Sequence, residues 1–224
     1  MARVRKLTEA FNSPLKQRLA PLGYTPRSGT IFVRDLSLGV FGTVGYLTSD
    51  RASSIKLFVG VHFEHVERLY DEIMSPFLTI PTKSTSKYFP TCFRDLYNLK
   101  EERSADPDFR LKESSYLQIS TLAVSDICDQ ILIDLQQYGI PFIDFNSSLS
   151  NVAATMAEGR GGGIGSVAYR LPIIYWILRR NDDAVRYMSD IAAQKYPIGP
   201  YPKYAATLTA RINAGPAPLS KNLH

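Results

Sequence analysis

Three segments rich in β-branched and aromatic residues follow one another early in the chain, and they constrain the fold more than any other feature. They span residues 29–35, 38–47 and 54–63, and only short polar connections separate them. Parallel strands need a long crossover connection, whereas antiparallel strands can be joined by a tight turn. This block therefore predicts an antiparallel sheet in the N-terminal half of the chain.

Helical and extended patterns surround this block. Apolar side chains recur at helical spacing through residues 7–22, and Pro14 interrupts them, which predicts either two short helices or one kinked helix. Residues 64–74 predict another helix. Further along, residues 88–99 and 115–120 predict additional strands.

The second half of the chain has helical periodicity. Gly139 and Pro141 predict the end of one helix. Pro172 predicts the start of another, because an interior proline costs about 3 kcal/mol. Asn181 and Asp182 predict the turn of a helical hairpin. The predicted helices span residues 127–138, 147–157, 171–178, 184–191 and 204–212.

Strands followed by helices predict an α+β fold, in which an antiparallel sheet in the N-terminal half is covered by helices that are mostly C-terminal. The chain has 224 residues and is 45% hydrophobic, which is enough to bury a sizeable core. We expect a single domain over residues 1–213 and a flexible tail over residues 214–224. Two subdomains joined near residue 121 are the alternative.

Cysteine content and hydropathy indicate a compartment. Cys92 and Cys128 are the only cysteines, which is too few for a disulfide framework. No apolar run reaches the length that spans a membrane, and the basic N-terminus lacks the apolar stretch of a signal peptide. These features predict a cytoplasmic protein with no membrane partner, and they leave its oligomeric state open.

Five of the 14 glycines lie within residues 159–165, just ahead of a helical pattern. The run is not a Walker A loop, because no Gly-Lys-Ser/Thr follows at the required spacing. Gly163, Gly165 and Ala168 fit a loose dinucleotide fingerprint, but that site needs a preceding strand where this chain predicts a helix. A connector between helices is therefore the favoured interpretation. If the run binds a ligand, the candidate residues are Gly161, Gly163, Gly165 and Ser166.

No group of residues has the spacing of a catalytic site. His62 and His65 lack the His-Glu-x-x-His pattern of zinc peptidases, and no Cys/His group elsewhere completes a metal site. Cys92 and His62 are the residue types of a nucleophile and its base, but a buried thiol is the favoured interpretation for Cys92. Asp182 and Asp183 are explained by helix capping. We therefore expect no catalytic residue, no metal and no cofactor.

The basic residues are dispersed, and the formal net charge of the chain is +5. A dedicated nucleic-acid binder usually shows a basic patch. Nucleic-acid binding is kept as an alternative, with Arg160, Arg179 and Arg180 as its candidate contacts. Arg3, Arg5, Lys6, Lys83 and Lys87 complete that candidate set.

Short motifs along the chain are similar to those of a group of uncharacterised bacterial α+β domains. Residues 11–24 resemble their opening helix, which ends in Leu-Gly-Phe/Tyr, and residues 29–34 resemble a hairpin that bears Phe-x-Arg. Residues 56–62 resemble a Phe-x-Val-x-Leu-Gly-Val strand, and residues 138–142 a Tyr-Gly-Ile/Leu-Pro-Phe helix exit. The helix pair near residues 170–193 resembles their closing pair.

This resemblance implies a single α+β domain. It implies no activity, cofactor or site residue, because the family has none assigned. The glycine run departs from the family pattern, which makes it a feature of this chain.

The leading functional hypothesis is a non-enzymatic protein that binds a protein partner, such as an immunity-like or accessory factor of a bacterial or phage system. It rests on the lack of a catalytic pattern and on 13 tyrosines, a residue type enriched at protein interfaces. The alternatives are a nucleic-acid-binding protein and a nucleotide-binding enzyme that uses residues 159–166. Because the chain is basic, an inhibited partner is expected to present an acidic surface.

Overall fold

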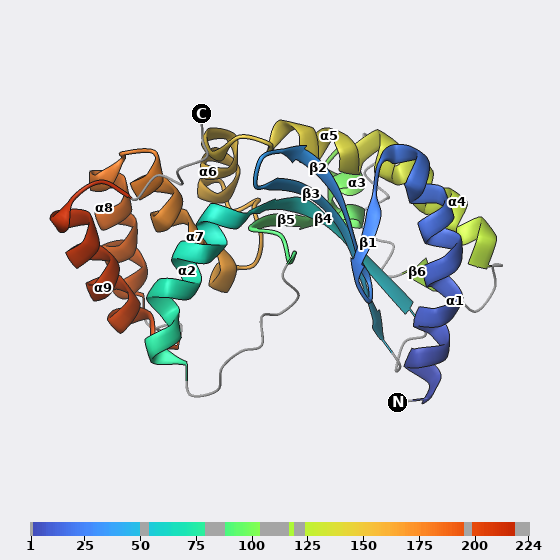
Figure 1. Cartoon of the computed structure of the whole chain (residues 1–224), viewed down its shortest axis with the longest axis horizontal. Helices are drawn as coiled ribbons and strands as arrows, with labels where there is room; N and C mark the ends of the chain where they lie inside the picture. The colour runs from blue at the N-terminus through green and yellow to red at the C-terminus, as the bar shows by residue number, and fades with distance from the viewer. Residues whose placement is uncertain are drawn as a thin grey trace.

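The structure is a computed structural model, which describes residues 2–49, 54–78, 88–103, 117–118, 124–194 and 199–217. It confirms the α+β prediction, because an antiparallel sheet forms in the N-terminal half and most helices follow it (Figure 1). One group of helices packs on the sheet, and a second group packs beyond one end of it.

The sheet is built from neighbouring strands in chain order. Five strands pair antiparallel, each with the next, and a sixth short strand pairs with the fourth. The three segments predicted from the sequence form its middle, and β1 precedes them unpredicted. The strands are β1 (Thr25–Ser28), β2 (Ile31–Ser37), β3 (Val40–Ser49), β4 (Ser54–Phe63), β5 (Cys92–Asp95) and β6 (Leu117–Gln118).

The two faces of the sheet differ because side chains alternate along each strand. Val44 of β3 lies opposite Phe32 of β2 and Val59 of β4, and all three belong to the main core. The opposite face carries a smaller cluster around Phe58, which includes half-buried aromatic rings from β5 and the residues before it.

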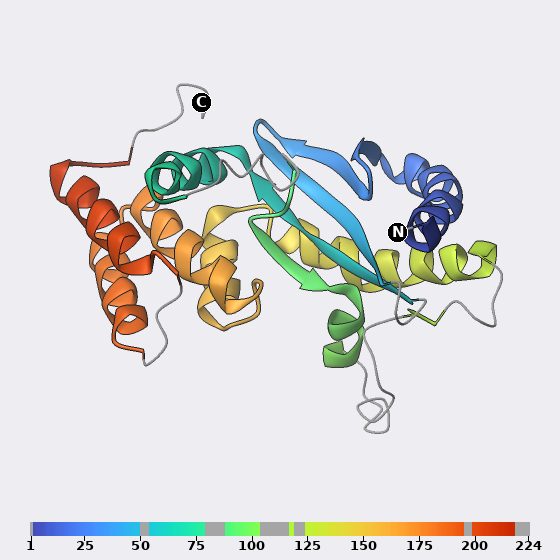
Figure 2. The same cartoon turned by 90° about the horizontal axis from the view of Figure 1, so that it is seen from below.

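Helices α1, α3, α4 and α5 lie on the main-core side of the sheet, and Figures 1 and 2 show α1, α4 and α5 there. Helices α1, α3 and α5 contact the strands, and α4 packs against α1. Their bounds are α1 (Ala2–Leu19), α3 (Leu96–Arg103), α4 (Val124–Asp134) and α5 (Ile140–Phe145). A short 3-10 turn, Ala20–Leu22, leads from α1 to β1.

The second group of helices begins with α2, which continues directly from β4 over the predicted residues 64–74 (Figure 1, left). Helices α7 and α8 pack as the predicted hairpin. The bounds of this group are α2 (Glu64–Met74), α6 (Leu149–Ala157), α7 (Ile164–Ile177), α8 (Asn181–Ala192) and α9 (Tyr201–Ala214).

Pro14 and Pro172 both lie inside helices. Helix α1 runs through Pro14 as one helix, so of the two predicted alternatives the pair of short helices is excluded. Helix α7 begins at Ile164 rather than near Pro172, which corrects that prediction. Pro172 is buried with most of α7, so burial of apolar surface offsets the hydrogen bond that the proline cannot donate.

The predicted helix end at Gly139 and Pro141 is also wrong. A π-turn, Leu135–Gly139, links α4 to α5, and the N–H of Ile140 donates to a carbonyl five residues earlier. Pro141 then lies at the start of α5, where a missing N–H costs little. The chain therefore continues its helical path to Phe145.

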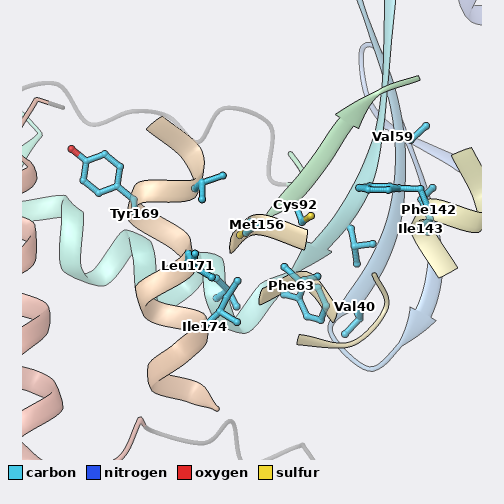
Figure 3. Close-up of a cluster of buried hydrophobic side chains, with 14 of the residues drawn as sticks. Val40, Val59, Phe63, Cys92, Phe142, Ile143, Met156, Tyr169, Leu171 and Ile174 are labelled. Atoms are coloured by element: carbon cyan, nitrogen blue, oxygen red, sulfur yellow. The ribbon is translucent and has the colours of Figure 1, made fainter. Parts of the chain in front are cut away.

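One hydrophobic cluster links the sheet to the second group of helices. Figure 3 shows Phe63 of β4, Met156 of α6 and Ile174 of α7 within it. Near the C-terminus, the indole N–H of Trp176 donates to the carbonyl of Gly215 at 3.1 Å. This bond attaches the first residues of the predicted tail to α7.

Some predictions fall where the structure gives no description. Residues 218–224 of the predicted tail, most of the predicted strand 115–120, and the candidate nucleic-acid contacts Lys83 and Lys87 lie outside the described residues. The predicted domain limits and the joint near residue 121 stay predictions.

Candidate functional site

A groove of about 1370 Å³ runs along α2, where this helix meets α6, α7 and the end of β4. The turn between β2 and β3 forms part of its rim. Much of its lining is apolar, and a smaller number of charged side chains project from α2 and α7. The apolar lining includes Leu38, Val40, Phe63, Leu78, Phe89 and Leu149.

Arg170 of α7 and Glu67 of α2 join the two helices within the groove. The Nε and Nη2 of Arg170 donate to the two carboxylate oxygens of Glu67 at 2.8 and 2.7 Å. The guanidinium also lies 4.4 Å from the centre of the Tyr70 ring. Burial lowers the pKa of Arg170, but the hydrogen bonds and charge of Glu67 outweigh it, and the pKa is raised. The positive charge of Arg170 is therefore already neutralised within the protein.

The groove is acidic although the chain as a whole is basic. With histidines neutral, four carboxylates against two guanidinium groups give its lining a net charge of −2. The groups are Glu64, Glu67, Asp71 and Glu72 against Arg68 and Arg170.

Two of these carboxylates have no ion-pair partner among the described residues. Glu67 is held by Arg170, and Glu72 lies 3.6 Å from Arg211 and 3.9 Å from Arg68. Glu64 and Asp71 form no ion pair with any residue in the described ranges. Burial and the neighbouring charge of Glu67 raise the pKa of Asp71, and Arg170 opposes this rise. The groove therefore contains unpaired negative charge beside apolar surface.

The two histidines at the junction of β4 and α2 make separate contacts. The Nδ1 of His62 lies 2.8 Å from the carbonyl oxygen of Phe89. Arg68 donates to the Nδ1 of His65 at 2.9 Å, and burial together with this arginine lowers the pKa of His65. Among the described residues, no group of three or more His, Cys, Asp or Glu side chains could hold a metal ion.

Cys92 and His62 are not placed as a nucleophile and its base. Cys92 lies opposite Val61 in the sheet and belongs to the main core, so the neighbouring His62 points to the other face. Burial raises the pKa of the Cys92 thiol to about 12, which keeps it protonated. The prediction of a buried thiol is confirmed for Cys92, and Cys128 is buried as well.

The glycine run connects α6 to α7 and packs on the edge strand β5. The carbonyl of Gly161 accepts a hydrogen bond from the N–H of Phe93 at 3.2 Å, which occupies part of an otherwise open sheet edge. A Cβ at Gly161 would lie 2.5 Å from the Cγ of Met156. The close approach of backbone to core explains a glycine at this position.

Of the four candidate ligand residues, Gly163, Gly165 and Ser166 line the groove, whereas Gly161 is buried. Gly163 caps α7, because its carbonyl accepts from the N–H groups of Ser166 and Val167. Helix α6 precedes the run, so the strand of a dinucleotide site is replaced by a helix. Ligand binding by these residues stays a prediction.

The three candidate nucleic-acid contacts do not share one surface. Arg160 lies in the glycine connector, 3.3 Å from Glu158. Arg179 and Arg180 follow the opposite end of α7, about 20 Å away at 1.5 Å per helical residue. Arg180 pairs with Asp183 at 2.7 Å. Nucleic-acid binding therefore has no common patch from these three residues and stays a prediction.

Arg179 ends α7 in a left-handed backbone conformation, with φ of 59°. Its N–H donates to the carbonyl of Trp176, and the N–H of Arg180 donates to that of Tyr175, a pattern that favours glycine. We expect Arg179→Gly to raise the free energy of unfolding by about 1 kcal/mol, because glycine has no Cβ to clash. Urea denaturation measures this change. Arg186→Gly in α8 is the control and should lower it by about 1 kcal/mol. Lower stability of Arg179→Gly would contradict the expectation.

No family model, curated protein or solved structure matches this chain. In the described part of the chain, no helix is long and apolar enough to cross a membrane. The resemblance to bacterial domains stays a prediction, so the functional argument rests on the groove.

Three of the candidate ligand residues predicted from the sequence, Gly163, Gly165 and Ser166, line the groove. The charged groups of the groove were not predicted. Glu67 and Arg170 are separated by 103 residues, and no local pattern links them. Asp71 carried one usable signal, because it is an acidic residue near the C-terminal end of the predicted helix 64–74, where a negative charge is unfavourable.

Proposed function

We propose that the protein is a non-enzymatic binding protein whose groove holds a segment of a protein partner with large apolar side chains. The observation that carries this proposal is the combination of volume and lining. Small-molecule pockets span about 300–1,000 Å³, and this groove, at about 1370 Å³, is larger. A peptide segment can fill such a space along the length of α2.

Exposed apolar side chains next to the groove support the same proposal. Leu38 at the rim is 69% exposed, and Ile164, between the lining residues Gly163 and Gly165, is 65% exposed. Side chains of this size gain free energy when a partner covers them, at roughly 25 cal/mol per Å² of apolar surface. Burial by a partner would explain why Leu38 and Ile164 are exposed in the free protein.

The charge of the groove favours this proposal over the nucleotide-binding alternative. A phosphate at the start of α7 would lie near the carboxylates on α2, and Arg170 has no free charge to offer it. We propose that the protein acts in the cytoplasm as an immunity-like or accessory factor of a bacterial or phage system. The buried, free state of its described cysteines is consistent with a reducing compartment.

Selection of short random peptides displayed on phage tests the proposal. Peptides rich in Leu, Phe, Tyr and Trp should be enriched on the immobilised wild-type protein. The best of them should bind the Leu38→Ser variant at least about tenfold more weakly, because burial of one leucine contributes about 1.5–3 kcal/mol. Fluorescence anisotropy of the labelled peptide gives the dissociation constants.

Ile133→Ser is the matched control, since Ile133 of α4 is 54% exposed and does not line the groove. It should leave peptide affinity unchanged. If Leu38→Ser binds as tightly as wild type, or if both variants lose affinity equally, the groove is not the binding site and the proposal fails.

A further inference from the structure

We infer that the partner segment held in the groove is cationic, with a lysine or arginine side chain placed against Asp71 of α2. This inference rests on the proposed function, because it assigns the chemistry of the segment that the groove holds. Its basis is charge complementarity between an acidic groove and its occupant.

The excess of negative charge belongs to the groove and not to the whole molecule. The lining has a net charge of −2, while the chain carries +5. The net charge of the chain would favour an acidic partner. A segment inside the groove, however, interacts most strongly with the charges that line it, because dissolved salt largely screens charges more than about 10 Å away. The local charge therefore decides which segment fits.

Both arginines of the groove already have partners. Arg170 is held by both oxygens of Glu67, and its side chain is only 14% exposed. Arg68 is 55% exposed and lies between His65 and Glu72, with Nη2 2.9 Å from the Nδ1 of His65. An anionic segment would therefore meet one exposed, already paired guanidinium group and the four carboxylates of the lining.

Asp71 is the carboxylate with the least compensation. It follows Glu67 by one helical turn, and it forms no ion pair with any of the described residues. Glu64 lies in the first turn of α2, where the helix dipole stabilises a carboxylate. Asp71 lies in the last turn of the same helix, where the dipole has the opposite effect. A cation from the partner would supply the compensation that the fold does not.

The neighbours of Asp71 define where the partner cation would lie. Burial and the nearby charge of Glu67 raise the pKa of Asp71, and the charge of Arg170 opposes this rise. A positive charge from the partner would lie near two carboxylates, Glu67 and Asp71. The guanidinium group of Arg170 is the cation next to both, and it is hydrogen-bonded to Glu67. The apolar lining, including Phe89 and Leu78, can then hold the hydrophobic side chains of the same segment.

The test selects displayed random peptides on three immobilised proteins: wild type, Asp71→Asn and Asp190→Asn. Asp190 is an exposed carboxylate on α8 that does not line the groove, so its substitution changes the charge equally. Melting temperatures confirm that all three are folded. Peptides retained by wild type and by Asp190→Asn should be enriched in Lys and Arg over Asp and Glu, and this enrichment should disappear on Asp71→Asn.

Fluorescence anisotropy then measures the best basic peptide and a version with glutamine in place of its basic residues. Asp71→Asn should weaken binding of the basic peptide by about fivefold, the upper range for an exposed ion pair. It should leave the affinity for the neutral version unchanged. Asp190→Asn should affect neither.

The outcomes separate the two proposals. If basic and neutral peptides bind equally, and both are weakened by Leu38→Ser but not by Asp71→Asn, the cationic segment is wrong and the groove proposal stands. If acidic peptides are enriched, the inference is also wrong. If no peptide binds in a way that depends on Leu38, both proposals fall together.

Discussion

The Glu67→Ala variant is expected to lose about 3 kcal/mol of folding free energy, the largest effect of any single substitution considered for the groove. Removal of the carboxylate leaves the charge of Arg170 without its counter-ion. Both side chains are mostly buried, at 17% and 14% exposure. An unpaired buried charge cannot recover its hydration, so the cost greatly exceeds that of a surface pair. Urea denaturation followed by circular dichroism gives the free energy of unfolding.

Glu72→Ala provides a matched control on the same helix. Glu72 is about half exposed and lies 3.9 Å from Arg68 and 3.6 Å from Arg211. Exposed pairs contribute about 0–1 kcal/mol, so its loss should be small. A Glu67→Ala variant no less stable than Glu72→Ala would show that the pair joining α2 to α7 contributes little.

A double variant separates buried charge from lost packing. Glu67→Leu combined with Arg170→Met removes both charges and keeps apolar volume, and such replacements are often neutral or stabilising. We expect the free energy of unfolding of the double variant to be close to that of wild type and well above that of Glu67→Ala. Equal instability of the two would assign the loss to packing between α2 and α7.

Gly161→Ala is the substitution with the second largest expected effect, a loss of about 2 kcal/mol. The added methyl group would lie 2.5 Å from the Cγ and 3.0 Å from the Cα of Met156, and 3.2 Å from the Sγ of Cys92. These neighbours are buried, so the connector must move away from β5. That movement would also weaken the hydrogen bond between Gly161 and Phe93. Thermal and urea unfolding measure the loss.

Gly163→Ser is the control within the same run. Its Cβ would meet no atom within 4 Å, and serine is favoured over glycine at a helix N-cap. Stability should stay the same or rise by a few tenths of a kcal/mol. If Gly161→Ala were as stable as Gly163→Ser, the glycine run would not be needed for packing, and ligand binding would become its favoured explanation.

The middle of the sheet could be predicted because local patterns decide it. The connections between β2, β3 and β4 are too short for a crossover, and the chain has only the hairpin solution. Helix α2 could be predicted as readily, because Val66, Leu69 and Ile73 repeat at helical spacing along one buried face. In both cases the signal lies within a few residues of the element.

Predictions failed where packing or capping overrode a local signal. The predicted strand 88–99 ends early, because the carboxylate of Asp95 accepts from the N–H of Tyr97 at 3.0 Å and helix α3 begins. Taken alone, Pro172 predicts the start of a helix, but the buried surface of α7 outweighs the cost of an interior proline. A single sequence does not contain the tertiary contacts that decide such cases.

The candidate site was less predictable than the fold. Its glycines were visible as a run, but their role depends on the distance to Met156 and β5. The ion pair of Arg170 and Glu67 unites residues from opposite halves of the chain. Such a pair becomes apparent only when α7 is packed against α2.

The π-turn at Leu135–Gly139 fixes the rotation of the helix that follows it. Its hydrogen bond spans five residues instead of four, so the turn holds one residue more than an α-turn while Ile140 still follows Leu135 by one turn. If the same residues formed a regular α-helix, α5 would be rotated by about 100°, Ile143 would turn away from the core and the half-buried Pro141 would turn toward it. Proteins that descend from the same ancestor should therefore tolerate the loss of one residue from this segment, which gives an α-turn with α5 in the same orientation, better than the gain of one.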